Sequence, residues 1–574
     1  MNVEQLRAMQ TDAIERLMKS RSEDGMWRGS LSSSAISTAV SVFALQRIDA
    51  VKYATNIQAG VRWLRGTMKA DGSWGDSVES PSNMTATLLT YVSLYAVGQA
   101  PAESRQYLNQ HFGGDSEEAL TKGVLRYYGR DLTFSVPILM MCALAGVVKD
   151  WKNIPPFPFE LATLPQRLFR YLNLPVVSYA IPALIAIGIC QMHNQNNHFS
   201  LFNPLRKLFV PKAMRVLLRM QPTDGGFLEA APLTAFVSMC LAEGGFRQHE
   251  VTQHCAQFLL DTVREDGSWP IDTNLSAWVT SLAAKVLPHN QVDAAGLAHL
   301  IKRNATTSVH PFTAAAPGGW GWSDLSGSVP DGDDTSGALV ALHHLTKGKR
   351  SPEVENGLKW LMWLQNNDGG MPTFCKGWGK LPFDRSTPDI TAHAILAMGL
   401  WLPSLEGKLK ADVQKSLDRM LTWMERSLEV RSGWVPLWFG DQDAADEKAP
   451  VYGTATAIDY LMSANHSVAT KLAQSQISFI LDTQNEDGGW GGNRDVKSKV
   501  TYTCRALAAL SHFPDREQPM TEAKQRGWDY LYQRFKDGTL YEREPIGLYF
   551  SRLWYSEELY NVLFLLNAIK GMTE

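Results

Sequence analysis

The chain has 574 residues, of which 45% are apolar and 10% aromatic, so it is long enough for several domains and can bury large cores. Its 55 basic and 58 acidic residues give a formal net charge of −3, which excludes the basic excess that phosphate-backbone binding needs, and we expect no nucleic-acid partner. The six cysteines are scattered without a C-x-x-C pair, which indicates a reducing compartment rather than a disulfide-rich or structural-zinc protein.

The predicted elements begin with a charged amphipathic helix within residues 1–25, which lacks the apolar centre of a secretory signal. Two apolar runs follow at 132–148 and 174–190. Each contains proline and is shorter than the roughly 20 residues that span a bilayer. We therefore expect helices buried between other helices, with a helix that dips into one bilayer face as the alternative.

A turn of the form Asp-Gly-X-Trp, or a close variant, recurs along the chain. Asp-Gly and Gly-Gly supply the positive φ angles of a tight reversal, and the Trp packs back over the preceding helix, where its N–H needs an acceptor. Helical patterns flank the turns, and several of them end in Gln, as in 360–365 and 477–484. The turns lie at Asp24–Trp27, Asp71–Trp74, Asp224–Phe227, Asp266–Trp269, Gly318–Trp320, Asp368–Met371, Gly433–Trp434, Asp487–Trp490 and Asp537–Thr539.

Most successive turns are about 50 residues apart, which is the length of one helical hairpin, and the longer gap between 74 and 227 leaves room for degenerate repeats. Repeated hairpins stack into a solenoid or close into a toroid of inner and outer helices. Alternating β-branched runs are rare, so we predict an all-α protein. Nine turns are too many for one ring of six hairpins, and we expect two rings with a boundary near residues 270–300.

Pro330–Ser336 holds three carboxylates within four positions, directly before a helix expected over 336–345. Capping by Asp334 or Thr335 is one interpretation, because acids are favoured at a helix N-terminus, but it explains one acid better than three. A metal site is the second, although the EF-hand pattern is not met. Proton chemistry is the third, because like charges this close cannot all ionise and one carboxyl then stays protonated near neutral pH.

A second polar pair lies downstream of the acids. Asp389 and His393 are four residues apart and therefore share one face of a helix. Aromatic and glycine-rich segments accompany both features. By itself, a helical His is most often a satisfied polar residue, and an aromatic stripe is most often core. These segments lie at 318–322, 436–440, 451–454, 547–550 and 553–555.

Together these motifs resemble the class II terpene cyclases of the squalene–hopene cyclase superfamily, over essentially the whole chain from Trp27 to Tyr560. The resemblance rests on the Asp331-X-Asp333-Asp334-Thr335 motif, the repeated turns, which match the QW repeats of that family, and the Asp389-X-X-X-His393 pair. It implies two α/α-barrel domains, one inserted after the first helix of the other. Residues 1–20 would pack on the C-terminal barrel, 21–280 would form the inserted barrel, and 281–574 would form the barrel with the acids.

The resemblance also implies the role of each motif residue. Asp333 would protonate a terminal alkene or epoxide, while Asp331 and Asp334 flank and orient it. His393 would hydrogen-bond the acid and strengthen it, and Asp389 would support that histidine. The carbocation would then migrate along the folded chain past aromatic faces, which stabilise it without trapping it. By position, the candidates for the cavity lining are Trp322, Tyr179, Phe374, Trp438, Tyr452, Tyr549 and Phe550.

The sequence departs from the squalene–hopene cyclase pattern in ways that bear on the substrate. Asp441-Gln442 stands where those enzymes carry another Trp, and an acidic insertion runs on to Lys448. Leu553 and Ser556 replace tyrosines, and 270–274 lacks an aromatic. We therefore expect a linear polyprenyl substrate of diterpenoid or sesterterpenoid size, or a meroterpenoid precursor with an aromatic or other polar head group, rather than squalene.

We expect no metal and no cofactor, a cytoplasmic location, and peripheral or monotopic contact with the cytoplasmic membrane face, with Phe169–Val177 and the following helix at an entrance channel. The oligomeric state stays open. The first alternative is a diphosphate-retaining cyclase similar to copalyl diphosphate synthases, which would need Mg²⁺. The second is a protein prenyltransferase subunit with zinc near Cys255, His254 and His249. The third is a non-catalytic α-toroid binding protein.

Overall fold

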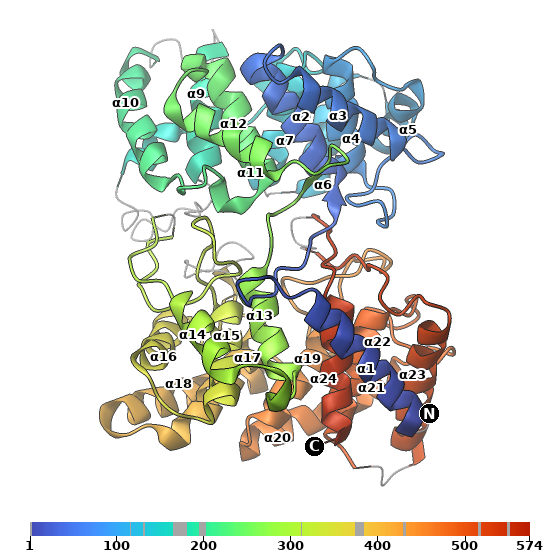
Figure 1. Ribbon diagram of the computed structural model, residues 1–574. Coiled ribbons are helices and arrows are strands. Elements are labelled where there is room, and N and C mark those ends of the chain that lie inside the picture. The colour runs from blue at the N-terminus through green and yellow to red at the C-terminus, as the bar shows by residue number, and fades with distance from the viewer. Residues whose placement is uncertain are drawn as a thin grey trace. The chain divides into compact units, whose positions relative to one another are not determined.

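The computed structural model describes residues 3–114, 116–129, 132–164, 181–194, 203–311, 313–372, 384–428, 432–514, 518–547 and 552–573. These residues are mostly helical (Figure 1), which confirms the predicted all-α class. Strand is confined, within the described ranges, to the antiparallel pair β1 (Ser33–Ser34) and β2 (Trp269–Pro270) and to isolated bridges.

The chain divides into two compact units. The acid-motif unit comprises residues 1–30, 274–324 and 329–574, and the inserted unit comprises 31–273 and 325–328. Residues 21–30 and 274–280, which we assigned to the inserted domain, therefore group with the acid-motif unit.

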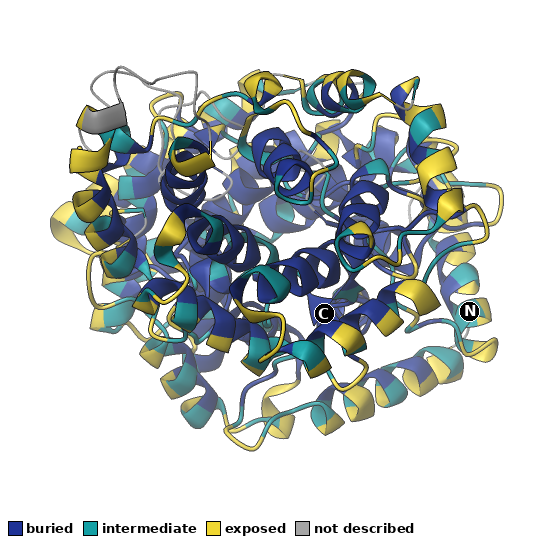
Figure 2. Ribbon diagram, turned by 90° about the horizontal axis from the view of Figure 1, so that it is seen from above, coloured by how far each residue is buried: buried dark blue, intermediate teal, exposed yellow. Residues whose placement is uncertain are grey.

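Six inner helices form a closed ring in the acid-motif unit, because each packs on the next and the last packs on the first. Almost every residue of an inner helix such as α17 is buried, so its apolar residues show no amphipathic stripe. Figure 2 shows such helices almost wholly dark blue. The ring consists of α13 (Ser276–Val286), α15 (Gly332–Thr346), α17 (Pro388–Trp401), α19 (Pro450–Ser463), α22 (Val500–Ser511) and α24 (Tyr560–Thr573).

Amphipathic outer helices cover this ring. Each buries one stripe at helical spacing, as α18 does with Val413, Leu417 and Met420. The outer helices are α14 (Ala294–Arg303), α16 (Pro352–Leu364), α18 (Gly407–Arg426), α20 (Ser467–Ser475), α21 (Ile477–Asp482) and α23 (Gln518–Lys536). The N-terminal helix α1 (Val3–Lys19) completes the layer, lying against α24 and α23 (Figure 1).

The inserted unit repeats the plan. Its inner helices are α2 (Ala35–Asp49), α4 (Met84–Ala96), α7 (Leu132–Leu144), α9 (Ile181–Asn194) and α11 (Ala231–Leu241), and α11 packs on α2. Its other helices are α3 (Ala54–Gly66), α5 (Ala102–Phe112), α6 (Glu117–Tyr128), α10 (Asn203–Met220) and α12 (Glu250–Thr262). Short helical turns of the inserted unit lie at Trp151–Asn153, Phe159–Thr163, Phe227–Glu229 and Ala242–Phe246. Those of the acid-motif unit lie at His289–Gln291 and Leu402–Ser404.

The two apolar runs of the sequence fall in α7 and α9. Both helices are buried along most of their length, as expected, and the long gap between Trp74 and Phe227 holds further helices of the same layered pattern. Among the described residues, no helix combines the length and the hydropathy needed to cross a bilayer.

Four of the predicted turn tryptophans donate their indole N–H to a carbonyl ten residues earlier, at the end of the preceding helix. The Trp490 indole bonds Ile480 at 2.8 Å. Gln484 completes this turn, since its amide donates to the carbonyls of Gly488 and Ala523, both at 2.8 Å. The other three pairs are Trp27 with Leu17, Trp74 with Leu64 and Trp269 with Leu259.

A threonine hydroxyl joins eight of the nine turns to an inner helix, a feature that we did not predict. At eight turns, the backbone N–H of the residue in the Trp position donates to such a hydroxyl. At Trp490 this bond to Thr503 is 3.0 Å, and the same hydroxyl donates to the Lys499 carbonyl at 2.8 Å. The other pairs are Trp27 with Thr280, Trp74 with Thr87, Phe227 with Thr234, Trp269 with Thr38, Trp320 with Thr335, Met371 with Thr391 and Trp434 with Thr454.

Replacing Thr503 with Val leaves the buried N–H of Trp490 without its acceptor. An unsatisfied buried polar group costs about 1–3 kcal/mol, so we expect the free energy of unfolding of Thr503→Val to fall by that amount. Thr503→Ser retains the hydroxyl, so its free energy of unfolding should fall less than that of Thr503→Val. Urea denaturation followed by tryptophan fluorescence measures the change. Thr422→Val, at an exposed position of α18, is the matched control, and equal losses in the two valine variants would contradict the prediction.

Candidate active site

The acid motif forms the N-terminus of α15. The helix begins at Gly332, before the expected range 336–345, and its N-cap is Asp331 rather than Asp334 or Thr335. The Asp331 carboxylate accepts the backbone N–H groups of Asp333 at 2.9 Å and Asp334 at 2.8 Å. Capping therefore accounts for one of the three acids and leaves the other two available for chemistry.

Asp331 and Asp334 form a buried carboxyl pair. Their exposed fractions are 5% and 8%, and their side chains are hydrogen-bonded to each other. Burial raises the pKa of Asp331 to about 7. Burial, together with the charge of Asp331, raises the pKa of Asp334 well above its usual value. The pair therefore retains at least one proton near neutral pH.

Asp333 differs from its two neighbours in the motif. Its side chain is 29% exposed, and its Oδ1 lies 2.6 Å from Nδ1 of His393. This hydrogen bond engages one of its two carboxyl oxygens. Asp333 is thus the acid of the motif that is both held by a histidine and accessible.

His393 lies on α17 and is 2% exposed. Its imidazole stacks on the ring of Tyr460, with centroids 4.2 Å apart and an interplanar angle of 11°, and meets the Trp278 ring edge-on at 6.1 Å. Burial lowers the pKa of His393; Asp333 opposes this shift, and Lys285 and Arg505 add to it. The imidazole is therefore neutral at pH 7 and donates its Nδ1–H to Asp333.

Asp389 lies one turn before His393 and is also buried. Its carboxylate accepts the Thr387 hydroxyl, which in turn accepts the Leu437 N–H at 3.3 Å. Burial raises the pKa of Asp389 to about 6. The described contacts of Asp389 thus join α17 to the segment before Trp438, and its support of His393 stays a prediction.

Three predicted lining residues fall within the described ranges. Tyr452 is buried, stacks obliquely on Phe439 at 4.9 Å, and accepts a 3.3 Å hydrogen bond from Arg505. The Trp322 carbonyl binds the first turn of α13, and Trp438 is half-buried next to the residue that bonds Thr387. Tyr179, Phe374, Tyr549 and Phe550 lie outside the described residues.

Sequence reasoning missed a buried charged cluster in the same ring. Asp459 on α19 lies 3.6 Å from the ammonium of Lys285 on α13, and its carboxylate is 2.9 Å from Nε2 of His512 and 3.1 Å from the amide of Asn567. Burial would raise the pKa of Asp459, but Lys285 and His512 outweigh it and hold the pKa below its usual value. The sequence signal that could have revealed this cluster is a single charged residue within a mostly apolar inner helix, Lys285 in α13 and Asp459 in α19.

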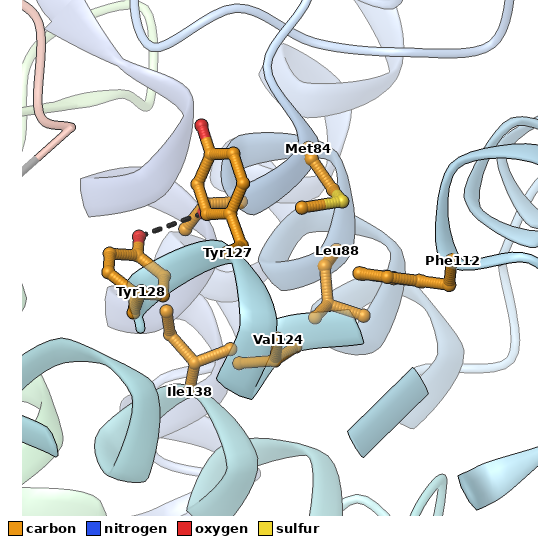
Figure 3. A pocket seen from close by; sticks show the side chains of 8 residues that line it. Met84, Leu88, Phe112, Val124, Tyr127, Tyr128 and Ile138 are labelled. Atoms are coloured by element: carbon orange, nitrogen blue, oxygen red, sulfur yellow. Dashed lines mark hydrogen bonds between the residues drawn. The ribbon is translucent and has the colours of Figure 1, made fainter. Parts of the chain in front are cut away.

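Another acid with a raised pKa lies elsewhere in the described chain: burial raises the pKa of Asp272 to about 8, and the charge of Asp224 adds to the shift. Cys255, the zinc candidate, is buried and accepts a 3.4 Å contact from the Gln221 amide, and the described residues contain no group of three or more His, Cys, Asp or Glu side chains suited to a metal ion. A small pocket between α4, α6 and α7 is lined by apolar and aromatic side chains and by the Thr85–Tyr128 hydrogen bond of 2.9 Å (Figure 3).

The buried carboxyl pair predicts how stability depends on pH. Since both pKa values are raised by folding, the folded chain holds more protons than the unfolded chain above about pH 4, and stability falls as pH rises, by about 1.4 kcal/mol per unit for each extra proton. The Asp334→Asn side chain cannot ionise, so this variant should lose less stability than the wild type as pH rises. Its Tm relative to wild type should therefore rise between about pH 5 and 8. Asp412→Asn, on an exposed part of α18, should show a constant offset. A Tm difference between wild type and D334N that stays flat with pH would contradict this.

Comparison with known proteins agrees with this architecture. The squalene–hopene cyclase C-terminal domain model matches residues 271–573, and the N-terminal domain model matches 11–284. The chain is 24% identical over 592 residues to an enfumafungin synthase of Hormonema carpetanum, covering 87% of this chain but 42% of that protein. It is 21% identical over 629 residues to a probable squalene–hopene cyclase of Sinorhizobium fredii, covering 93% of this chain and 91% of that one.

A solved structure shares the fold. The ent-copalyl diphosphate synthase from Streptomyces platensis superposes with a TM-score of 0.60 at 16% identity, covering 99% of this chain and 100% of the other. The two domain models between them account for almost every residue, from position 11 to 573. The chain belongs to the squalene–hopene cyclase family.

Proposed function

We propose that the chain is a class II terpene cyclase, an enzyme that starts the cyclisation of a linear polyprenyl chain by protonating its terminal alkene or epoxide. The supporting observation is the contrast within the acid motif. Asp331 and Asp334 are buried and share a hydrogen bond, whereas Asp333 is 29% exposed and held by His393 at 2.6 Å. Family membership supports the same reaction class.

The reaction begins with a proton on Asp333. The proton moves to the terminal alkene carbon, the π electrons of that alkene form the new C–H bond, and a tertiary cation and an Asp333 carboxylate remain. An alkene is a very weak base, so the acid must be strengthened, and the Nδ1–H of His393 does this by stabilising the carboxylate that is left behind. Because the Asp331–Asp334 pair retains at least one proton, it places less negative charge beside this carboxylate than two ionised acids would.

The cation then passes along the folded substrate as successive double bonds attack it. Aromatic faces stabilise such a cation by about 0.5–2 kcal/mol each, and they offer no lone pair that would trap it. Tyr452, Trp322 and Trp438 are the described residues that we assign to this role. Burial raises the pKa of Tyr452 to about 12, so its hydroxyl stays neutral and does not form the more nucleophilic phenolate.

The substrate class that we propose is a polyprenyl chain of diterpenoid or sesterterpenoid size, or a meroterpenoid precursor. The position where squalene–hopene cyclases carry a Trp is occupied by Asp441, whose fully buried carboxylate binds the Lys499 ammonium and the Gly492 N–H at 2.9 Å. This ion pair anchors the acidic insertion instead of presenting a ring, which argues against squalene. We propose that this chemistry needs no metal or cofactor.

A diphosphate-retaining cyclase is the second candidate. The structural neighbour with the shared fold is an ent-copalyl diphosphate synthase, and such an enzyme would use the same acid on a substrate that keeps its diphosphate with Mg²⁺. The two candidate functions differ in their need for Mg²⁺, which the diphosphate-retaining cyclase requires and the first candidate does not.

The decisive experiment incubates the purified chain with squalene, geranylgeranyl diphosphate and prenylated aromatic acids, with and without a chelator, and identifies products by mass spectrometry. We expect a cyclised product that forms in the presence of chelator. Because a general acid contributes about 10²–10⁴-fold, Asp333→Asn should lose at least about a hundredfold in turnover, while Asp412→Asn should retain it. Chelator-sensitive turnover of the diphosphate would favour the second candidate. Full activity of a folded D333N would contradict the role of Asp333 as the proton donor, and a folded wild type that forms no product from any of these substrates would favour the binding-protein alternative.

We also propose peripheral membrane contact through α10, since a polyprenyl substrate resides in lipid. The candidate segment Phe169–Val177 lies outside the described residues. In α10, Leu205, Leu208 and Phe209 are exposed by 57%, 75% and 40%. The helix has no acidic residue, and its basic residues are Arg206, Lys207, Lys212, Arg215 and Arg219. Exposed apolar side chains beside basic ones fit an anionic lipid surface.

Leu208→Glu tests the membrane contact by placing a negative charge in the exposed apolar group. We expect the wild type to sediment with phosphatidylcholine vesicles that contain phosphatidylserine, and L208E to remain largely in the supernatant, because it loses apolar contact and gains repulsion. Val468→Glu is the matched control, since Val468 is an exposed apolar residue on α20. Equal vesicle binding by L208E and V468E would contradict the proposal.

A further inference from the structure

A partly buried cation, Lys285, is connected through one aromatic ring to the histidine that holds Asp333. The Nζ of Lys285, in the last turn of α13, is 5.0 Å from the ring centroid of Tyr460 on α19. The Tyr460 ring is stacked at 4.2 Å on the imidazole of His393, which bonds Asp333. The chain of contacts from the Lys285 ammonium to the Asp333 carboxyl therefore runs through one phenol ring and one imidazole.

A second cation comes from α22. Arg505 is 3% exposed, and its guanidinium lies 3.8 Å from the Phe564 ring centroid and donates to the Tyr452 hydroxyl at 3.3 Å. A guanidinium stays charged at any pH at which the protein is folded. This position therefore contributes a permanent positive charge to the same interior.

The negative charge in contact with these cations is smaller. Asp459 contacts Lys285 at 3.6 Å, and it is shared with His512 and Asn567. Two cations are thus accompanied by one carboxylate in these contacts, and the charge of each cation lowers the pKa of His393. Three charged groups act on His393: Asp333 from α15, Lys285 from α13 and Arg505 from α22. The Tyr460 ring from α19 stacks on it, Asp389 lies one turn earlier on its own helix, and Asp459 from α19 contacts Lys285.

The location of one proton depends on this charge. In the Asp333–His393 pair, a single ionisable proton can reside on the carboxyl, which gives two neutral groups, or on the imidazole, which gives a carboxylate and an imidazolium. Only the first arrangement can protonate an alkene. A nearby positive charge disfavours the imidazolium, and burial of the imidazole acts in the same direction.

We propose that Lys285, together with Arg505, is a positioning residue for the acid, whose charge keeps the shared proton on Asp333 rather than on His393. The same cations stabilise the Asp333 carboxylate once the proton has left, which strengthens the acid. The inference rests on the proposed function and adds residues to its machinery that do not touch the substrate.

The first test uses the pH profile of turnover. Lys285→Met should lose about tenfold in turnover, and the alkaline limb of its profile should move up by about one pH unit, because the pair then holds its proton more tightly but on the imidazole. Lys285→Arg keeps the charge and should retain the wild-type profile. Arg505→Gln, on a different helix, should shift the profile in the same direction as K285M. Lys359→Met removes an exposed lysine of α16 and should change neither quantity.

The second test needs no substrate. In protein labelled with ¹⁵N-histidine, the His393 signals, assigned by their loss in His393→Gln, report whether the imidazole is neutral or protonated. We expect a neutral imidazole in the wild type near neutral pH and an imidazolium in K285M. Lys285→Gln, whose amide can still bond Asp459, gives the same readout if K285M does not fold. An unchanged imidazole in the neutral variants would overturn the proposal even if no substrate of the wild type were found, and lost turnover with an unchanged profile and signal would overturn it too.

Discussion

The hydrogen bond between a turn amide and a threonine hydroxyl of an inner helix is the constraint on which the acid site depends. At the acid motif, the Trp320 N–H donates to Thr335 at 3.0 Å, and the Trp320 carbonyl accepts the Asp331 N–H at 3.0 Å. The motif is therefore one more turn-to-helix junction of the repeat. A general structural device holds the start of α15 rigidly, and the acids occupy positions that the device leaves free.

Three identical side chains then acquire different properties from their surroundings. Asp331 caps the helix, Asp334 shares a hydrogen bond with it in a buried position, and Asp333 projects toward a histidine and remains partly exposed. Burial raises the pKa values of Asp331 and Asp334, whereas Asp333 is partly exposed, so the difference comes from the surroundings and not from the residue type. Chemically identical groups thus take different roles because their surroundings differ.

Local patterns in the sequence were sufficient for the helical repeat, the acid motif and the Asp389–His393 face, because turn chemistry and helical spacing act over a few residues. Thr280 could not be recognised in the same way, since it serves a turn 253 residues away. Lys285 contacts Tyr460, and Tyr460 stacks on His393, only after three helices have packed together in the ring. The expected N-cap of α15, Asp334 or Thr335, is wrong because the three acids of the motif are equally good caps in sequence terms, and the structure places Asp331 in that position.

The Trp27–Thr280 bond and the packing of α1 on α24 have a consequence for biosynthesis. Helix α1 is made before the inserted unit but has its partners in segments that are made hundreds of residues later, whereas the inserted unit is complete long before them. A nascent chain can therefore fold the inserted unit during translation, but α1 must wait with its apolar stripe uncovered until α24 has been made. The temporary exposure of the apolar stripe of α1 thus follows from the order of the elements along the chain.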